Sequence, residues 1–444
     1  MNRLNTRIAS GEMYFYYDSA LAGIPVQVYL DQKVDGSILE RALERTLEVH
    51  PYLTRTLREE NGDFYLSGPA SAANSAGSNE IKSKIALTAG ERYPELGLGC
   101  AVPYPASVRY HENTIGFSFF HGFMDGLAAK RVLETIVYFY FCEKDPVDYP
   151  ADGVMTKPAA EYSSLSAEPC ACKYSLSEIS GDCSETESEN TAPGEAPALF
   201  SLAGMPENSG SESVIQVVRI PSDRLMAYSR QNGMSPSIAI GLLAVKAIQA
   251  LHPDNKKTVR INIPVSLRDA LGIPDTFKNA TSDVALYVDP VRLVSSRGEE
   301  MRVLGSELRR ELKEKLRPDR LRQAANSLTD FLALAAQNRG YEARHSFYNS
   351  LTPPTADTIF ISYMGKFNAP GYGEHLTGCD IATMPRDGFV FNMYDCDGNF
   401  NISLIKYGTD CTYVNTFMNI CAEENLPAML VRNEEYRLER VYIR

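Results

Sequence analysis

The chain has 444 residues, enough for two or three domains, and its 44% hydrophobic and 23% charged content is typical of globular proteins. A formal net charge of −12 disfavours binding to nucleic acid or to an anionic membrane, because both require a basic surface. No export signal and no membrane-spanning run is visible, and the nine cysteines are scattered. We therefore expect a cytoplasmic protein with reduced thiols and no metal site.

The first part of the chain alternates strands and helices. Ser37 and Glu40 predict a capping box at the start of a helix that Pro51 ends, and Asn61-Gly62 predicts a turn between two strands. Further along, "TIGFSFF" predicts a strand, and "LAAKRVLETIVYFYF" predicts a helix that is apolar around much of its circumference. Such a helix is expected to be well buried.

The composition changes near residue 152. Ser, Glu, Gly and Pro dominate residues 152–213, and such a segment buries too little apolar surface to offset its ordering entropy. We interpret this range as a poorly packed crossover between two lobes. Its short apolar patch "ALFSLAG" would attach it to the rest of the protein. The crossover separates an N-terminal lobe, residues 1–151, from a C-terminal lobe, residues 214–444.

The C-terminal lobe repeats the pattern of strands and helices. "VIQVVRI" and "KTVRINIPVSLRD" predict strands, and between them Ser235 and Pro236 are suited to be the N-cap and first residue of an apolar helix. The expected fold class is therefore α/β, with two lobes that each hold a mixed sheet flanked by helices. A basic run at residues 308–323 predicts either a solvated helix with i,i+4 ion pairs or a contact for phosphates or an acidic carrier protein.

The stretch "FSFFHGFMDGLAAK" holds the main candidate for chemistry. His121 follows an aromatic strand, Asp125 precedes a helix, and Gly122 and Gly126 lie beside them. A core histidine, a carboxylate at a helix N-terminus and two turn glycines would explain these residues without any function. A neutral imidazole at the same place would equally suit a general base near neutral pH. The residues alone leave both interpretations open.

Several segments together resemble one known group of proteins. "HGFMDG" matches the H-x-x-x-D-G motif of the coenzyme A-dependent acyltransferase superfamily with the chloramphenicol-acetyltransferase fold, which includes condensation domains and alcohol acetyltransferases. "HPYLTRTL", "INIPVSLRD" and "ISYMGKF" are similar to other segments of that superfamily and follow in the same order, so the resemblance covers nearly the whole chain. It implies two chloramphenicol-acetyltransferase-like lobes arranged as a V with a central channel.

The resemblance also implies roles for individual residues. His121 would be the general base, and the pair of Asp125 with Arg268 would tie the two lobes together beneath the site. Four residues would support the site structurally: Gly122, Asp125, Gly126 and Arg268. Two more would contact the channel or the oxyanion: Ser362 and Gly365.

Departures from the motifs narrow the resemblance. Phe120 stands where condensation domains carry a second histidine, and the chain contains no tryptophan, which the signature of the plant acyltransferases requires. In the late segment, Ser362 is followed by Tyr363 in place of asparagine. These differences favour a stand-alone acyltransferase near the alcohol-acetyltransferase branch.

The expected reaction moves an acyl group from a thioester to a hydroxyl or amine of a small molecule. Acyl-CoA, or a phosphopantetheine thioester, would be the co-substrate, and no bound cofactor is implied. Two alternatives stay open: a free-standing condensation enzyme that uses a thioester bound to an acyl carrier protein, and a non-catalytic relative that acts as a binding module.

Overall fold

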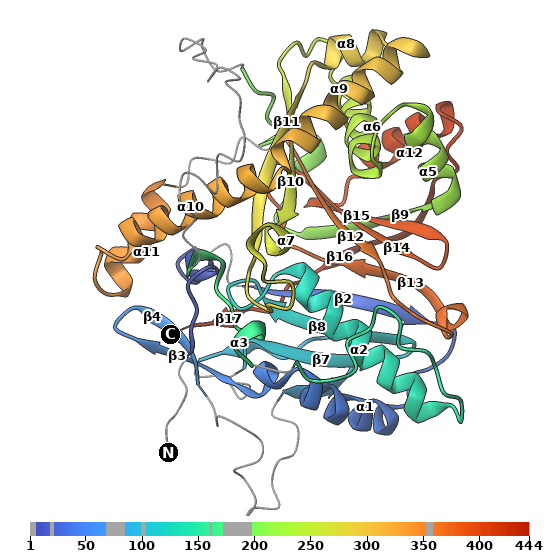
Figure 1. Cartoon of the computed structure of the whole chain (residues 1–444). Helices are drawn as coiled ribbons and strands as arrows, with labels where there is room; N and C mark the ends of the chain where they lie inside the picture. The colour runs from blue at the N-terminus through green and yellow to red at the C-terminus, as the bar shows by residue number, and fades with distance from the viewer. Residues whose placement is uncertain are drawn as a thin grey trace, which may run out of the picture.

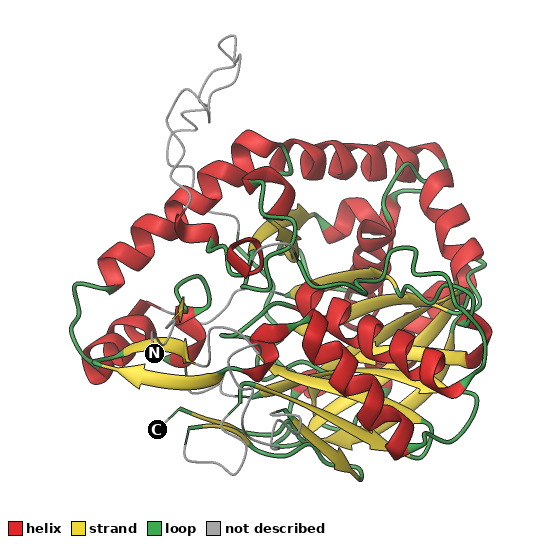
Figure 2. Ribbon diagram, turned by 60° about the horizontal axis from the view of Figure 1, so that its bottom comes forward, coloured by secondary structure: helices red, strands yellow, loops and turns green. Residues whose placement is uncertain are grey.

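The computed structural model describes residues 6–17, 22–67, 85–98, 104–159, 162–171, 198–351 and 358–443. Two β-sheets form the framework, one in each of two lobes, and helices cover them from outside (Figures 1 and 2). The predicted α/β class with two lobes is confirmed.

The first lobe is built on a five-stranded sheet. Its strands, in spatial order, are β13 (Leu376–Ile381), β2 (Gly23–Leu30), β8 (Thr114–Phe120), β7 (Ala106–His111) and β5 (Ala86–Ala89). Helices α1 (Gly36–Val49) and α2 (Gly126–Lys144) pack against each other, and α2 also contacts β2 and β8. Strand β8 is buried along its whole length, as its apolar sequence predicts.

The second lobe is built on a seven-stranded sheet. Its strands, in spatial order, are β11 (Thr281–Val288), β10 (Val259–Ser266), β12 (Ile359–Lys366), β14 (Phe389–Cys396), β15 (Asn399–Tyr407), β9 (Ser213–Pro221) and β16 (Met429–Tyr436). Helix α6 (Pro236–Leu251) lies at the centre of this lobe and contacts α5 (Ser222–Gln231), α8 (Pro290–Ser295), α9 (Glu299–Lys315) and α12 (Thr412–Glu423). Ser235 caps α6 and Pro236 is its first residue, as predicted.

Shorter elements complete the fold. A small sheet joins β1 (Thr6–Arg7), β4 (Asp63–Ser67) and β3 (Thr56–Glu60), and another joins β17 (Val441–Tyr442) to β6 (Leu96–Gly97). The remaining helices include α3 (Tyr162–Leu165), α7 (Arg268–Leu271), α10 (Pro318–Ala335), α11 (Tyr341–Leu351) and the 3₁₀ turn η1 (Glu12–Phe15). Figure 1 shows α10 and α11 leaving the second lobe and reaching down beside the first.

One local prediction is wrong, and another agrees with the structure. The N-cap of α1 is Asp35, which accepts hydrogen bonds from the backbone amides of Ser37 (2.8 Å) and Ile38 (3.2 Å), so the predicted capping box at Ser37 is wrong. The helix begins two residues earlier because the Asp35 carboxylate already accepts from the first free amides of the helix. The basic run is divided between α9 and α10, and Lys315 pairs with Glu311 at 2.5 Å, the predicted i,i+4 contact.

The predicted crossover is packed at both of its described ends, which corrects the expectation of a poorly packed segment there. Leu165 and Leu202 are almost fully buried, and Phe200 lies in the core of the second lobe. The carboxylate of Glu168 accepts hydrogen bonds from the backbone amides of Ala9 (3.1 Å) and Ser10 (3.0 Å). The middle of the predicted crossover, residues 172–197, lies outside the described residues.

The late part of the chain contributes strands to the first lobe. Strand β13 comes late in the chain but pairs with β2 of the first sheet, and β17 near the C-terminus pairs with β6. The division at residues 151 and 213 therefore stays a proposal about sequence segments, since residues 376–381 belong in space to the first sheet.

Within the described part of the chain, no single helix has the length and apolarity to cross a membrane; only α5 and α6 taken together, bent by 84°, reach that length and composition.

Candidate active site

A cavity of about 200 Å³ lies between the two sheets, and His121 is in its wall. The first lobe lines it with Ile24 of β2 and Phe119 of β8, and the second lobe lines it with Ser362 of β12 and Asn392 of β14. Ser362 and Asn392 are paired across neighbouring strands, so both side chains lie on the same face of the sheet. The site is therefore formed only where the two lobes meet.

The local sequence explains how His121 reaches this cavity. The buried aromatic strand β8 ends at Phe120, and α2 begins at Gly126, so His121 lies in the short turn between them. Asp125 caps α2 by accepting a hydrogen bond from the amide of Ala128 at 3.0 Å. A fixed strand end and a capped helix start hold the turn from both sides.

The ring of His121 is enclosed by aromatic and amide groups. Tyr14 stacks on it with centroids 4.3 Å apart and an interplanar angle of 8°, and Phe119 approaches it edge-on at 6.2 Å. The amide Nδ2 of Asn279 lies 3.2 Å from the ring Nδ1 and 3.4 Å from the carbonyl oxygen of His121. Burial lowers the pKa of His121, although a hydrogen bond with its own backbone and the nearby negative charge of Asp125 raise it in part, so the neutral imidazole is favoured.

Asp125 points away from the imidazole and binds Arg268, so the predicted contact is present. Its Oδ2 lies 2.7 Å from Nη1 and its Oδ1 2.9 Å from Nη2 of Arg268, and the amide of Ala280 donates to it at 3.0 Å. Arg268 also donates to the carbonyl groups of Thr276 and Lys278. Both charged side chains are almost fully buried. Burial alone would raise the pKa of Asp125, but Arg268 and the backbone amides outweigh it and hold that pKa below its usual value.

The two motif glycines lie at close approaches. A side chain at Gly122 would place its Cβ 2.5 Å from the ring of Phe120 and 2.6 Å from that of Phe15. Gly126 lines the cavity, and a Cβ there would lie 2.9 Å from the methyl group of Met364 on β12. Rigid rings thus close the position of Gly122 to larger residues, whereas at Gly126 the flexible end of Met364 would have to move.

The structure does not bring the two late candidates together at the cavity. Ser362 lines it, and its hydroxyl lies 3.8 Å from the sulfur of Met364. Gly365 has a positive φ of 76° and lies beside Lys130. It is not one of the described residues that line the cavity.

Sequence reasoning missed four polar residues that surround His121: Tyr14, Asn279, Asp283 and Arg386. Tyr14 belongs to the aromatic run "MYFYY", where nothing local distinguishes the one tyrosine that faces the cavity. Asn279 follows Arg268 by eleven residues, and its neighbours Thr276 and Lys278 bind Arg268, a proximity that only the folded chain reveals.

The described residues offer no comparable second site. Over the described ranges, no three His, Cys, Asp or Glu side chains gather as metal ligands would. A larger hollow of about 440 Å³ lies between β11, α8 and α9, and its walls combine leucine and valine side chains with acidic and basic ones, among them the exposed pair of Arg292 with Glu307.

No protein-family model matches the sequence, and a sequence search of curated proteins finds no match. Solved structures do match. TRI101 of F. graminearum in complex with coenzyme A and deoxynivalenol has a TM-score of 0.60 at 11% identity, over 96% of this chain and 100% of that chain.

Two further structures are similar over comparable lengths. TRI3 trichothecene 15-O-acetyltransferase from Fusarium sporotrichioides has a TM-score of 0.59 at 11% identity, covering 95% of this chain and 94% of that chain. The epimerization domain from the third module of tyrocidine synthetase B has a TM-score of 0.57 at 11% identity, covering 95% and 97%. At such identities the likeness shows the fold. The chain thus has the two-lobed fold that coenzyme A-dependent acyltransferases share with condensation-type domains.

Proposed function

We propose that the protein transfers an acyl group from a thioester, acyl-CoA in the first place, to a hydroxyl or amine of a small-molecule acceptor. The observation that carries this proposal is a histidine in the wall of a cavity between the two lobes, with its neighbouring carboxylate bound to Arg268 and with burial favouring its neutral form. The TRI101 structure with coenzyme A and deoxynivalenol supports the substrate classes at the level of fold. A cytoplasmic location stays part of this proposal.

His121 acts as the general base. Its unprotonated ring nitrogen takes the proton of the acceptor as the acceptor oxygen or nitrogen attacks the thioester carbonyl. The tetrahedral intermediate then collapses, the carbon–sulfur bond breaks, and the departing thiolate receives that proton. Hydrogen bonds with the backbone of His121 and Met124 raise the pKa of the His121 ring in part and so stabilise the imidazolium that forms during transfer. Asp125 and Arg268 support the turn from beneath, and the hydroxyl of Ser362 is the side-chain donor that we assign to the oxyanion.

Two other functions use the same cavity. A carrier-bound phosphopantetheine thioester carries the same reacting group as acyl-CoA, and the likeness to an epimerization domain supports such a donor. A non-catalytic relative would keep the fold and bind a ligand without turnover. The three functions differ in whether thiol is released from acyl-CoA, only from a carrier-bound thioester, or from neither, so one assay distinguishes them.

We expect the protein to release free thiol from at least one acyl-CoA when pooled alcohols and amines are added, and much more slowly without them. The test is a panel of acyl-CoAs of increasing chain length with colorimetric detection of thiol, and mass spectrometry of the acylated acceptor. Release only from acyl-phosphopantetheine on a carrier protein would identify the condensation function. Tight coenzyme A binding with no release from any donor would identify the non-catalytic one.

The pH dependence of the reaction tests the base. Because burial lowers the pKa of His121 from its ordinary 6.5, the neutral form persists below that pH, and the acidic limb of kcat/KM should fall at a pH below 6.5. Activity is thus retained as the pH decreases through 6.5 and is lost only when it passes the lowered pKa. A limb at or above 6.5 in the steady-state profile would contradict this assignment.

A further inference from the structure

The N-terminal turn η1 lies directly over the proposed base. Tyr14 of this turn stacks on His121, and its neighbour Phe15 packs on Phe120 with centroids 4.8 Å apart. The backbone contact is equally close, since a Cβ at Gly11 would lie 2.2 Å from the carbonyl oxygen of Gly122. The turn thus forms one wall of the cavity and touches the H-x-x-x-D-G loop through both rings and backbone.

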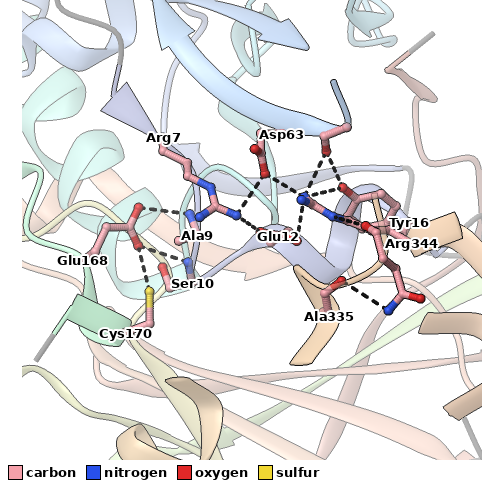
Figure 3. A network of polar contacts seen from close by, with 12 residues as sticks. Arg7, Ala9, Ser10, Glu12, Tyr16, Asp63, Glu168, Cys170, Ala335 and Arg344 are labelled. Atoms are coloured by element: carbon pink, nitrogen blue, oxygen red, sulfur yellow. Dashed lines mark hydrogen bonds and ion pairs between the residues drawn. The ribbon is translucent and has the colours of Figure 1, made fainter. Parts of the chain in front are cut away.

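Buried charges hold this turn in place (Figure 3). Glu12 is 1% exposed and pairs with Arg7 at 2.9 Å and with Arg344 of α11 at 3.2 Å. Asp63 of β4 binds the same two arginines at 2.9 Å and 2.7 Å. Arg344 also donates to the hydroxyl of Tyr16 at 3.2 Å. Helix α11 and strand β4 therefore fix both ends of the turn.

A second attachment connects the turn to the loop that carries Asn279. Lys278 is fully buried, and its Nζ lies 2.7 Å from Glu168 and 2.8 Å from the carbonyl oxygen of Arg7. Glu168 in turn binds the amides of residues 9 and 10, and it is visible beside them in Figure 3. The same short stretch of chain is thus held by ion pairs on one side and contacts His121 on the other.

A stacked ring has two physical effects on an imidazole. It limits the orientations that the imidazole can adopt, and it keeps water from one face, which disfavours the charged form. Tyr14 is well placed for both, because its ring lies parallel to the imidazole with centroids 4.3 Å apart. Burial, with Asp283 nearby, raises the pKa of Tyr14 to about 12, although a hydrogen bond with Asn279 lowers it in part. The charged groups that face His121 are Asp125, which favours the imidazolium, and Arg386, which disfavours it.

We propose that Tyr14 is a positioning residue for His121, and that the buried charges around Glu12 hold it against the imidazole. This inference rests on the proposed acyl transfer for its effect on rate, but the geometry that it describes is independent of the substrate. The N-terminal turn is then part of the active site, although it lies more than a hundred residues from the motif in sequence.

Replacing the ring tests the first half of the proposal. In Tyr14→Ala the pKa of His121, followed by NMR titration, should rise toward 6.5, the acidic limb of kcat/KM should shift by the same amount, and kcat should fall ~10–100-fold. Tyr14→Phe keeps the ring and should retain the parent values of both. An unchanged pKa and kcat in Tyr14→Ala would overturn the proposal, and so would a Tyr14→Phe variant as impaired as Tyr14→Ala.

Loosening the attachment tests the second half while Tyr14 stays in place. Gly11→Ala and Glu12→Gln should each raise the pKa of His121 and lower kcat in the same direction as Tyr14→Ala. Glu311→Gln is the matched control, because it removes one carboxylate from an exposed ion pair with Lys315 and should change neither quantity. A lower melting temperature with an unchanged pKa in both test variants would show that the charges serve folding alone and overturn this half. Since the NMR measurement needs no turnover, an inactive parent protein would refute the proposed function without deciding this proposal.

Discussion

His121→Ala is expected to lose ~10²–10⁴-fold in the rate of acyl transfer while its melting temperature stays near that of the parent protein. The rate falls because, among the described residues that line the cavity, the other nitrogen bases are the guanidinium groups of Arg268 and Arg386, which are donors only and cannot accept a proton. The fold is spared because His121 is only half-buried and its ring contacts are the stack with Tyr14, the edge-on approach of Phe119 and the approach of Asn279. Initial rates beside thermal melting curves measure both quantities.

His111→Ala provides the matched control for this variant. His111 ends strand β7 at the surface, where its partner is the exposed Glu91 at 3.6 Å. The control should keep both rate and melting temperature. A strongly destabilised His121→Ala would mean that the histidine serves packing, and an unchanged rate would remove it from the mechanism.

Asp125→Ala should behave in the opposite way and lose stability together with activity. The substitution leaves the Arg268 guanidinium buried with only carbonyl partners, and breaking a buried pair from one side costs about 3–5 kcal/mol. It also removes the N-cap of α2, which adds ~1 kcal/mol. Together these are a large share of a typical stability of ~5–15 kcal/mol. Urea unfolding should show the loss, and Arg268→Ala should resemble it.

Asp289→Ala separates the two contributions. Asp289 caps the short helix α8 by accepting from the amides of Val291 and Arg292 but has no buried cation, so its loss should cost ~1 kcal/mol only. The pH dependence gives a second check. Because the folded pKa of Asp125 is lowered, its contribution is complete above its unfolded value near ~3.9 and is lost as the pH falls through the folded value. A fully stable Asp125→Ala that is slow would instead mean that the carboxylate orients the imidazole.

Local signals in the sequence predicted those parts of the fold that local contacts determine. The turn at Asn61-Gly62 has the two positive φ angles that its residues favour, and Ser235 caps its helix as written in the sequence. Strand β13 was missed, because its sequence "LTGCDI" mixes polar and apolar residues, and its strand conformation depends on pairing with β2.

The residues of the candidate site also divide into those that a sequence segment reveals and those that only the fold reveals. His121 and Asp125 were found because the H-x-x-x-D-G motif lies within one short stretch, and the resemblance of "INIPVSLRD" to a second family segment led to Arg268. Tyr14 and Asn279 were missed because the fold alone brings each of them to His121. An aromatic residue in a run of aromatic residues gives no sign of which ring faces a cavity.

The late position of β13 in the chain affects how the first lobe folds during translation. Leu376 pairs with Leu30, and Ile381 with Val26, so the N-terminal sheet receives its outer strand only near the end of translation. At ~5–20 residues per second, a ribosome needs ~20–70 s to pass from β2 to β13. During that time the nascent sheet presents β2 as an open edge to which another polypeptide can add. The first half of the gene would therefore not encode a self-sufficient product, since it would lack residues 376–381 and would have to obtain them in trans.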